Sequence, residues 1–296
     1  MHPPPFTYIR PESLEEALDL LAEHGNEAVP LAGGQSLLPF MKLTQLGPSF
    51  LVDISRLVGL DGVHNQSDGL RIGPLTRHAQ VAQAVWPIHL AILGDTARVI
   101  ADVQVRNRGT VGGSLAYADP AGDWSSAMLA LGASVTLRSK TSERNVLMAD
   151  FFTGEHETAI APGELLSEVA APQVHPSSTG AYVKLARRHG DYAVASVAVQ
   201  IDWAEDGRIN HAGIGMGGVG DTPIKAGAAE VFLQGRPLDA SVIAEARELV
   251  MEATEPHSDF RGTAQFRKQM AGELFTRALN AAQRRKRGEP AQTGYL

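Results

Sequence analysis

The 296-residue sequence contains no cysteine. A chain without cysteine forms no disulfide, offers no thiolate nucleophile and supplies no sulfur ligand to an iron–sulfur cluster. It also has no apolar run long enough to cross a membrane, and its first residues, MHPPP, lack the basic and apolar regions of a classical secretion signal. We therefore expect a cytoplasmic protein with no transmembrane segment. If it handles electrons, any metal centre lies on another chain.

Positive charge is also in short supply. Lysine and arginine number 26 against 33 aspartates and glutamates, which gives a net charge of −7 and argues against general nucleic-acid binding. The ten histidines show no metal-ligand spacing such as H-E-x-x-H. Hydrophobic residues make up 44% of the chain and charged residues 20%, so we expect a soluble globular protein with a real core.

Two glycine-rich turns are the most informative features present. The first spans residues 31–37 (LAGGQSL) and is predicted to follow a strand at 28–32 and to open a helix after Ser36. The second spans residues 110–114 (TVGGS), in a predicted loop at 102–114. Glycines allow close approach and positive φ, and successive N–H groups form an anion-binding nest. A single turn of this type is usually an ordinary connection, but two can line a pyrophosphate from both sides.

In their order along the chain, these motifs resemble the FAD-binding medium subunit of molybdenum hydroxylases, the xanthine dehydrogenase and carbon monoxide dehydrogenase family. The matching segments are AGGQSL at 32–37, TVGG at 110–113 with the Asp-Pro-x-x-Asp run at 119–123, and RHGDYA at 188–193. The resemblance covers nearly the whole chain. It implies an α+β fold, with a two-lobed FAD-binding domain at 1–175 and a C-terminal domain of antiparallel sheet and helices at 176–296.

The resemblance also implies a set of FAD contacts. The pyrophosphate would lie on the two turns, and Asp123 would accept hydrogen bonds from ribose hydroxyls. Lys184 and Tyr192 would come near the isoalloxazine ring, although a solvated lysine and a half-buried strand tyrosine explain them equally well. The expected cofactor-binding residues are Leu31, Ala32, Gly33, Gly34, Gln35, Ser36, Leu37, Ile100, Thr110, Val111, Gly112, Gly113, Ser114, Asp123, Leu166, Lys184 and Tyr192.

Three of these positions carry specific reservations. Many family members have histidine where this chain has Gln35, and glutamine keeps a donor but cannot become cationic. Ile100 and Leu166 match apolar positions beside the flavin, yet ordinary core packing explains them as well.

The sequence Gly213–Gly220 contains G-x-G-x-x-G twice, but Asp-Thr-Pro follows, so we expect a glycine-rich strand end that binds no nucleotide.

The remaining patterns predict the elements that frame these motifs. A capping box at Ser13 and Glu16 starts a helix that ends at Gly25, and Thr76 is expected to cap a helix through Val85. A boundary is expected at 172–179. The other predicted helices are 88–101, 224–233, 240–252 and 263–284; the predicted strands are 50–54, 70–72, 134–138, 145–148, 165–170, 182–187, 193–203 and 208–216, the last two joined at Asp206-Gly207.

The function implied by the resemblance is electron transfer within a larger complex. A large subunit would carry the molybdopterin cofactor, a small subunit would carry [2Fe-2S] clusters, and FAD on this chain would pass electrons to an external acceptor. The expected assembly is a dimer of heterotrimers. A self-contained FAD-dependent oxidase or reductase is the alternative, and a scaffold that has lost its cofactor is a third possibility. The organic substrate and the acceptor are not encoded in these residues.

Overall fold

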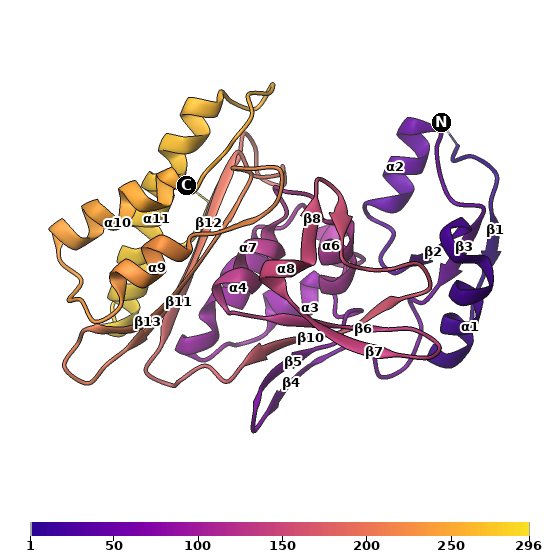
Figure 1. Ribbon diagram of the computed structural model, residues 1–296, viewed down its shortest axis with the longest axis horizontal. Helices are drawn as coiled ribbons and strands as arrows, with labels where there is room; N and C mark the ends of the chain where they lie inside the picture. Colours follow the sequence, from indigo (N-terminus) through magenta and orange to yellow (C-terminus); the bar gives the residue numbers. More distant parts are fainter. Residues whose placement is uncertain (1, 296) are drawn as a thin grey trace.

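The computed structural model describes residues 2–295, which form a two-domain α+β structure. Figure 1 shows an N-terminal lobe at one end, a second lobe in the middle, and the C-terminal helices at the other end. The C-terminal sheet lies between these helices and the middle lobe. No helix among the described residues is both long and apolar enough to cross a membrane.

The N-terminal lobe is a small parallel sheet with helices. Its strands run in the order β1 (Thr7–Ile9), β3 (Phe50–Asp53) and β2 (Ala28–Leu31). Its helices are α1 (Leu14–His24), the 3-10 turn η1 (Gly25–Glu27) and α2 (Leu37–Thr44). The Ser13 side chain accepts the Glu16 N–H and Gly25 ends α1, as predicted. The helix start after Ser36 is likewise confirmed.

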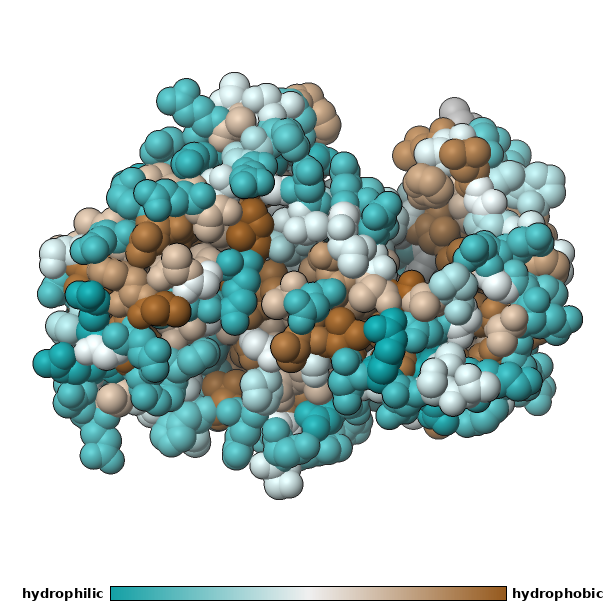
Figure 2. Space-filling model, in the orientation of Figure 1, coloured by the Kyte–Doolittle hydropathy of each residue, from teal (hydrophilic) through white to brown (hydrophobic). Residues whose placement is uncertain are grey.

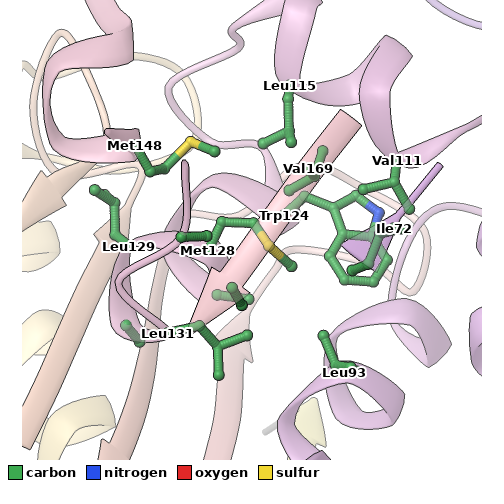
Figure 3. Packing of buried hydrophobic residues seen from close by; sticks show 14 of the residues in the cluster. Ile72, Leu93, Val111, Leu115, Trp124, Met128, Leu129, Leu131, Met148 and Val169 are labelled. Carbon is green, nitrogen blue, oxygen red and sulfur yellow. The ribbon is translucent and has the colours of Figure 1, made fainter. Parts of the chain in front are cut away.

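The middle lobe has an antiparallel sheet in the order β4–β5–β10–β6–β7. Its core contains Trp124 and Met128, both fully buried among aliphatic side chains (Figure 3). The strands are β4 (Val63–Gln66), β5 (Gly69–Ile72), β6 (Ser134–Arg138), β7 (Glu143–Leu147) and β10 (Leu165–Pro172), with a hairpin of β8 (Phe152–Gly154) and β9 (Glu157–Thr158). The helices are α3 (His78–Gln83), η2 (Ile88–Leu90), α4 (Ala91–Arg98), α5 (Val103–Arg106), α6 (Val111–Tyr117), α7 (Asp123–Ala130) and α8 (Met148–Phe151).

The C-terminal domain is a five-stranded sheet covered on both faces. Helix α11 packs on one face of the sheet, whereas α4 and α7 of the middle lobe pack on the other. Because side chains alternate along a strand, Ala181 and Val183 of β11 join the core beneath α11, and Tyr182 joins the core of the middle lobe. The sheet consists of β11 (Thr179–Leu185), β12 (Ala195–Trp203), β13 (Ile209–Gly217), β14 (Ile224–Lys225) and β15 (Gly294–Tyr295), and its helices are α9 (Gly227–Leu233), α10 (Ala240–Glu252) and α11 (Ala264–Lys286).

Several local predictions were wrong. Residues 102–114 are not one loop, because Asp102 caps α5 and Thr110 caps α6. Helix α3 begins at His78, and the Thr76 hydroxyl donates to the Gly62 carbonyl instead of capping a helix. The helix predicted at 88–101 is a 3-10 turn followed by the shorter α4. Capping bonds of Asp102 and Thr110 divide residues 102–114 into two short helices that sequence periodicity does not resolve.

The C-terminal sheet also differs from expectation at its edges. Residues 224–225, predicted as helix, form β14, and β15 pairs in parallel with β11, so the sheet is not wholly antiparallel. The glycine-rich strand end is confirmed: a Cβ on Gly213 would lie 1.9 Å from the Ala130 carbonyl oxygen, and one on Gly215 would lie 2.0 Å from that of Ser126. These glycines let the backbone of α7 lie directly against β13.

Candidate functional site

A cavity of about 550 Å³ lies where the two N-terminal lobes meet the C-terminal domain. Figure 2 shows the surface hollowed between the lobe that carries α2 and the rest of the molecule. All of the predicted cofactor-binding residues line this cavity except Val111, which is fully buried behind it. Segments from residues 31, 110, 123, 166, 184 and 192 therefore converge on one site.

The first glycine turn presents free backbone donors. The N–H groups from Gly33 to Leu38 have no acceptor among residues 2–295. Five of these six residues line the cavity, and only Leu38 does not. Gly34 has φ of +70°, which glycine adopts without steric cost. These free N–H groups, together with the start of α2, have the features of an anion-binding nest.

In the second glycine turn only the Thr110 N–H lacks an acceptor among residues 2–295, because the four N–H groups that follow are already paired. The Val111 N–H donates to Thr76 O and the Gly112 N–H to Pro74 O, each at 2.9 Å. The Gly113 N–H donates to the Thr110 hydroxyl at 3.1 Å. The Ser114 N–H completes the set with a 3.0 Å bond to Thr110 O. The expectation of a backbone nest at this turn was wrong, because helix α6 and the 74–76 segment already use these groups.

Glycine is required at the two turns for different reasons. A Cβ on Gly33 would lie 2.2 Å from the carbonyl oxygen of Arg108, so the first turn rests on the backbone that leads into the second. A Cβ on Gly112 would lie 2.4 Å from the Cβ of Pro74. Gly33 therefore holds the two turns together, whereas Gly112 is needed for packing within the middle lobe.

A buried ion pair forms another wall of the cavity. The Lys184 ammonium lies 2.9 Å from Oδ1 and 3.0 Å from Oδ2 of Asp123, and the two side chains are only 1% and 6% exposed. The Tyr182 hydroxyl donates to Asp123 Oδ1 at 2.5 Å. Burial, and then the Asp123 charge, raises the pKa of Tyr182 well above its usual value. Lys184 is thus not a solvated lysine.

This cluster was only partly predictable. The alternation of β11 places Tyr182 and Lys184 on the face toward α7, whose first residue is Asp123. Asp123 already receives two side-chain donors, which the sequence analysis did not anticipate. Tyr182 itself was missed, and its spacing of two residues from Lys184 on a predicted strand was the available signal.

Tyr192 lies at the mouth of the cavity, in the loop before β12 rather than in a strand. Its side chain is 38% exposed, and burial of the phenol together with the Asp119 charge raises its pKa. Burial also raises the pKa of Asp119. Gly190 and Asp191 of the same loop line the cavity as well.

His78 is a cavity residue that the sequence analysis missed. Its Nδ1 accepts a 3.0 Å hydrogen bond from the indole N–H of Trp124, which places the proton of the neutral ring on Nε2. Burial, reinforced by the nearby Arg106 charge, lowers its pKa to about 4. Ile100 and Leu166 are both buried and also line the cavity.

Comparison with known proteins identifies the family. The model of the FAD-binding domain in molybdopterin dehydrogenase matches residues 4–174, and the model of the CO dehydrogenase flavoprotein C-terminal domain matches residues 180–282. The chain belongs to this family of FAD-binding medium subunits. The family's cofactor is FAD, and its members are dehydrogenase subunits of molybdenum-containing oxidoreductases.

Individual relatives are similar over nearly their full length. The chain is 38% identical to the 6-hydroxypseudooxynicotine dehydrogenase complex subunit alpha of Paenarthrobacter nicotinovorans, covering 97% of each chain. It is 39% identical to the carbon monoxide dehydrogenase medium chain of Afipia carboxidovorans, covering 96% of this chain and 99% of the relative. The structure of carbon monoxide dehydrogenase from Hydrogenophaga pseudoflava superposes with a TM-score of 0.92 at 36% identity, covering 96% and 99% of the two chains. The expected two-domain fold is confirmed.

Proposed function

We propose that this chain is the electron-transfer subunit of a heteromeric molybdenum hydroxylase. It would take electrons from iron–sulfur clusters of a small partner subunit and pass them through FAD to an external acceptor. Oxidation of the organic substrate would take place at a molybdenum cofactor on a large subunit. The domain boundary at 175/176, the dimer of heterotrimers and the cytoplasmic location belong to the same proposal.

The open donors of the first glycine turn carry this proposal. The N–H groups from Gly33 to Leu38 suit a pyrophosphate, because they are unpaired within the described chain and come from one short segment at the start of a helix. The second turn contributes the Ser114 hydroxyl and the Thr110 N–H, because the N–H groups from Val111 to Ser114 are already paired. Together the two turns would hold the diphosphate of FAD, with Gly33 fixing their separation.

The cavity walls near Lys184 fit the other parts of the cofactor. The buried pair of Lys184 and Asp123 would face the sugar and ring portions, and Tyr192 would cover part of the flavin at the cavity mouth. The bound FAD supplies the redox chemistry, while these residues bind and orient it and exclude water.

The names of the relatives support a multi-subunit assembly. Two are called medium chains or complex subunits, and the Hydrogenophaga structure is described as lacking the Mo-pyranopterin moiety of its molybdenum cofactor. Since this chain has no cysteine, iron–sulfur clusters held by thiolates would lie on its partner.

Native mass spectrometry of the chain purified from its own source, with identification of the released cofactors, tests the proposal. We expect a larger and a smaller partner, together with FAD, molybdopterin and iron. The separated chain with FAD should lack activity on the organic substrate that the intact assembly oxidises. A lone chain with one FAD that oxidises a substrate unaided would instead establish a self-contained flavoenzyme.

A further inference from the structure

Tyr295, in the C-terminal tail, joins two segments of the cavity wall. Its hydroxyl accepts the Gly190 N–H at 2.8 Å and donates to the Val99 carbonyl at 2.7 Å. Gly190 lines the cavity, and Val99 directly precedes Ile100, which also lines it. One hydroxyl therefore links the loop at 188–192 to the segment at 99–101.

The tail, residues 288–295, is anchored independently of this hydroxyl. Its last two described residues form β15, which pairs with Val183 and Lys184 of β11. The Thr293 hydroxyl donates to Asp95 Oδ1 at 2.9 Å. Asp95 is 3% exposed and forms an ion pair with Arg285 at 2.6 Å, so the tail is attached to a rigid part of the molecule.

The contacts of Tyr295 continue to the buried ion pair. The Val99 carbonyl, which accepts from Tyr295, lies 3.4 Å from the Lys184 ammonium, and that ammonium pairs with Asp123. The same ammonium lies 5.5 Å from the centroid of the Tyr295 ring, within the range of a cation–π contact. A displacement of Tyr295 would therefore alter the surroundings of Lys184.

The loop that Tyr295 holds lies directly on the 99–101 segment. Gly190 has φ of +92°, and a Cβ there would be 3.4 Å from the carbonyl carbon of Ala101. Arg106 fixes that segment from its other side by donating to the carbonyls of Ile100 and Ala101 at 2.7 and 2.8 Å. The base is thus rigid, and the loop that carries Tyr192 is bonded to it through Tyr295.

From this geometry we propose that Tyr295 is a positioning residue, and that the tail acts as a strap that fixes Tyr192 and the Lys184 wall around the flavin. The inference rests on the proposed FAD site. The strap lies beyond residues 180–282, which the C-terminal family model matches, so it adds a contact outside that model.

Replacing Tyr295 with Phe in the full chain tests the strap, because Phe keeps the ring and removes only the hydroxyl. We expect FAD to dissociate about fivefold faster, because the two hydrogen bonds that the hydroxyl makes to Gly190 and Val99 are lost. The flavin midpoint potential and absorption spectrum should shift as well. Tyr8→Phe is the matched control, since the Tyr8 hydroxyl bonds to Asp53 and does not line the cavity. It should leave FAD release within twofold of the natural protein.

The outcomes separate the strap from the cofactor proposal. If the natural chain holds no FAD, the proposed function fails. If it holds FAD and Tyr295→Phe leaves the potential and spectrum unchanged, the strap is overturned even if FAD release is faster. Thr293→Val provides a second test should Tyr295→Phe not fold: it removes the hydrogen bond to Asp95 at the other anchor, and we expect about a fourfold faster release. Unchanged release and potential in that variant would likewise overturn the strap.

Discussion

The two glycine turns look alike in sequence and differ in structure. The first leaves the N–H groups from Gly33 to Leu38 unpaired within the described chain, whereas the second uses those from Val111 to Ser114 for α6 and the 74–76 segment. The first turn thus has donors available to a ligand, whereas the second stabilises the contact between α6 and the 74–76 segment. The comparison teaches that a Gly-Gly motif specifies close backbone approach, while the surrounding segments decide whether its donors are available to a ligand.

The largest expected effect comes from adding a side-chain atom at the point where the two turns touch. In Gly33→Ala the new Cβ would lie 2.2 Å from Arg108 O, so the two turns must separate. We expect FAD affinity to fall by at least about 100-fold and the free energy of unfolding by about 2–3 kcal/mol. Fluorescence titration and chemical denaturation measure these changes.

Gly227→Ala is the matched control for this substitution. No atom lies within 4 Å of a Cβ at this helical glycine, so the change should raise the free energy of unfolding by up to about 1 kcal/mol and leave FAD binding unchanged. Tight FAD binding by Gly33→Ala would show that the spacing of the turns does not matter.

His78 should make the free energy of unfolding depend on pH, because its ring is buried. It lies next to the second turn, since its backbone N–H donates to Gly109 O. Its folded pKa of about 4 lies below the unfolded value of about 6.5, so the unfolded chain takes up a proton first as pH falls. Stability should therefore be lost between about pH 6.5 and pH 4, by about 3 kcal/mol.

Denaturation at pH 7 and pH 4 measures this dependence. His78→Gln should remove about 3 kcal/mol of the pH-dependent loss, whereas His64→Gln, at an exposed position, should not change it. An equal pH dependence in the natural chain and His78→Gln would mean that carboxylates account for the whole effect.

A charge placed on the first turn tests its role as an anion site. Gln35 is exposed at the turn and lines the cavity, so Gln35→Glu should weaken FAD binding about tenfold at low salt and less at high salt. The same change at Gln66, on β4 and away from the cavity, should have no effect. Equal affinities across a salt series would place the pyrophosphate elsewhere.

The smallest expected effect concerns the cap of the second turn. Thr110→Val removes the acceptor of the Gly113 N–H and should lower the free energy of unfolding by about 1 kcal/mol, with less than a threefold change in FAD affinity. Thr263→Val removes the equivalent cap of α11 and should cost the same stability with no change in FAD binding. A loss of FAD affinity above tenfold in Thr110→Val alone would mean that this hydroxyl contacts the cofactor.

Much of the fold followed from local patterns. The helix from Leu14 was predictable from its capping box and apolar stripe, and α10 from its periodicity. The short helices between 76 and 117 were not, because their starts depend on how single polar side chains bond: the Thr76 hydroxyl donates to Gly62 and caps no helix, whereas the Thr110 hydroxyl caps α6. Strand β15 was missed because two residues paired at a sheet edge have no periodic signal.

The sequence by itself determined the family, the two glycine turns and sixteen of the residues that line the cavity, since these depend on motifs in a fixed order. Only the tertiary structure decided which donors are free, because that depends on whether Pro74 and Thr76 lie against the second turn. It also decided that Lys184 is a buried partner of Asp123 and that Tyr295 reaches the cavity wall. Such pairings join residues 61 and 105 positions apart, and burial rather than residue type sets their chemistry.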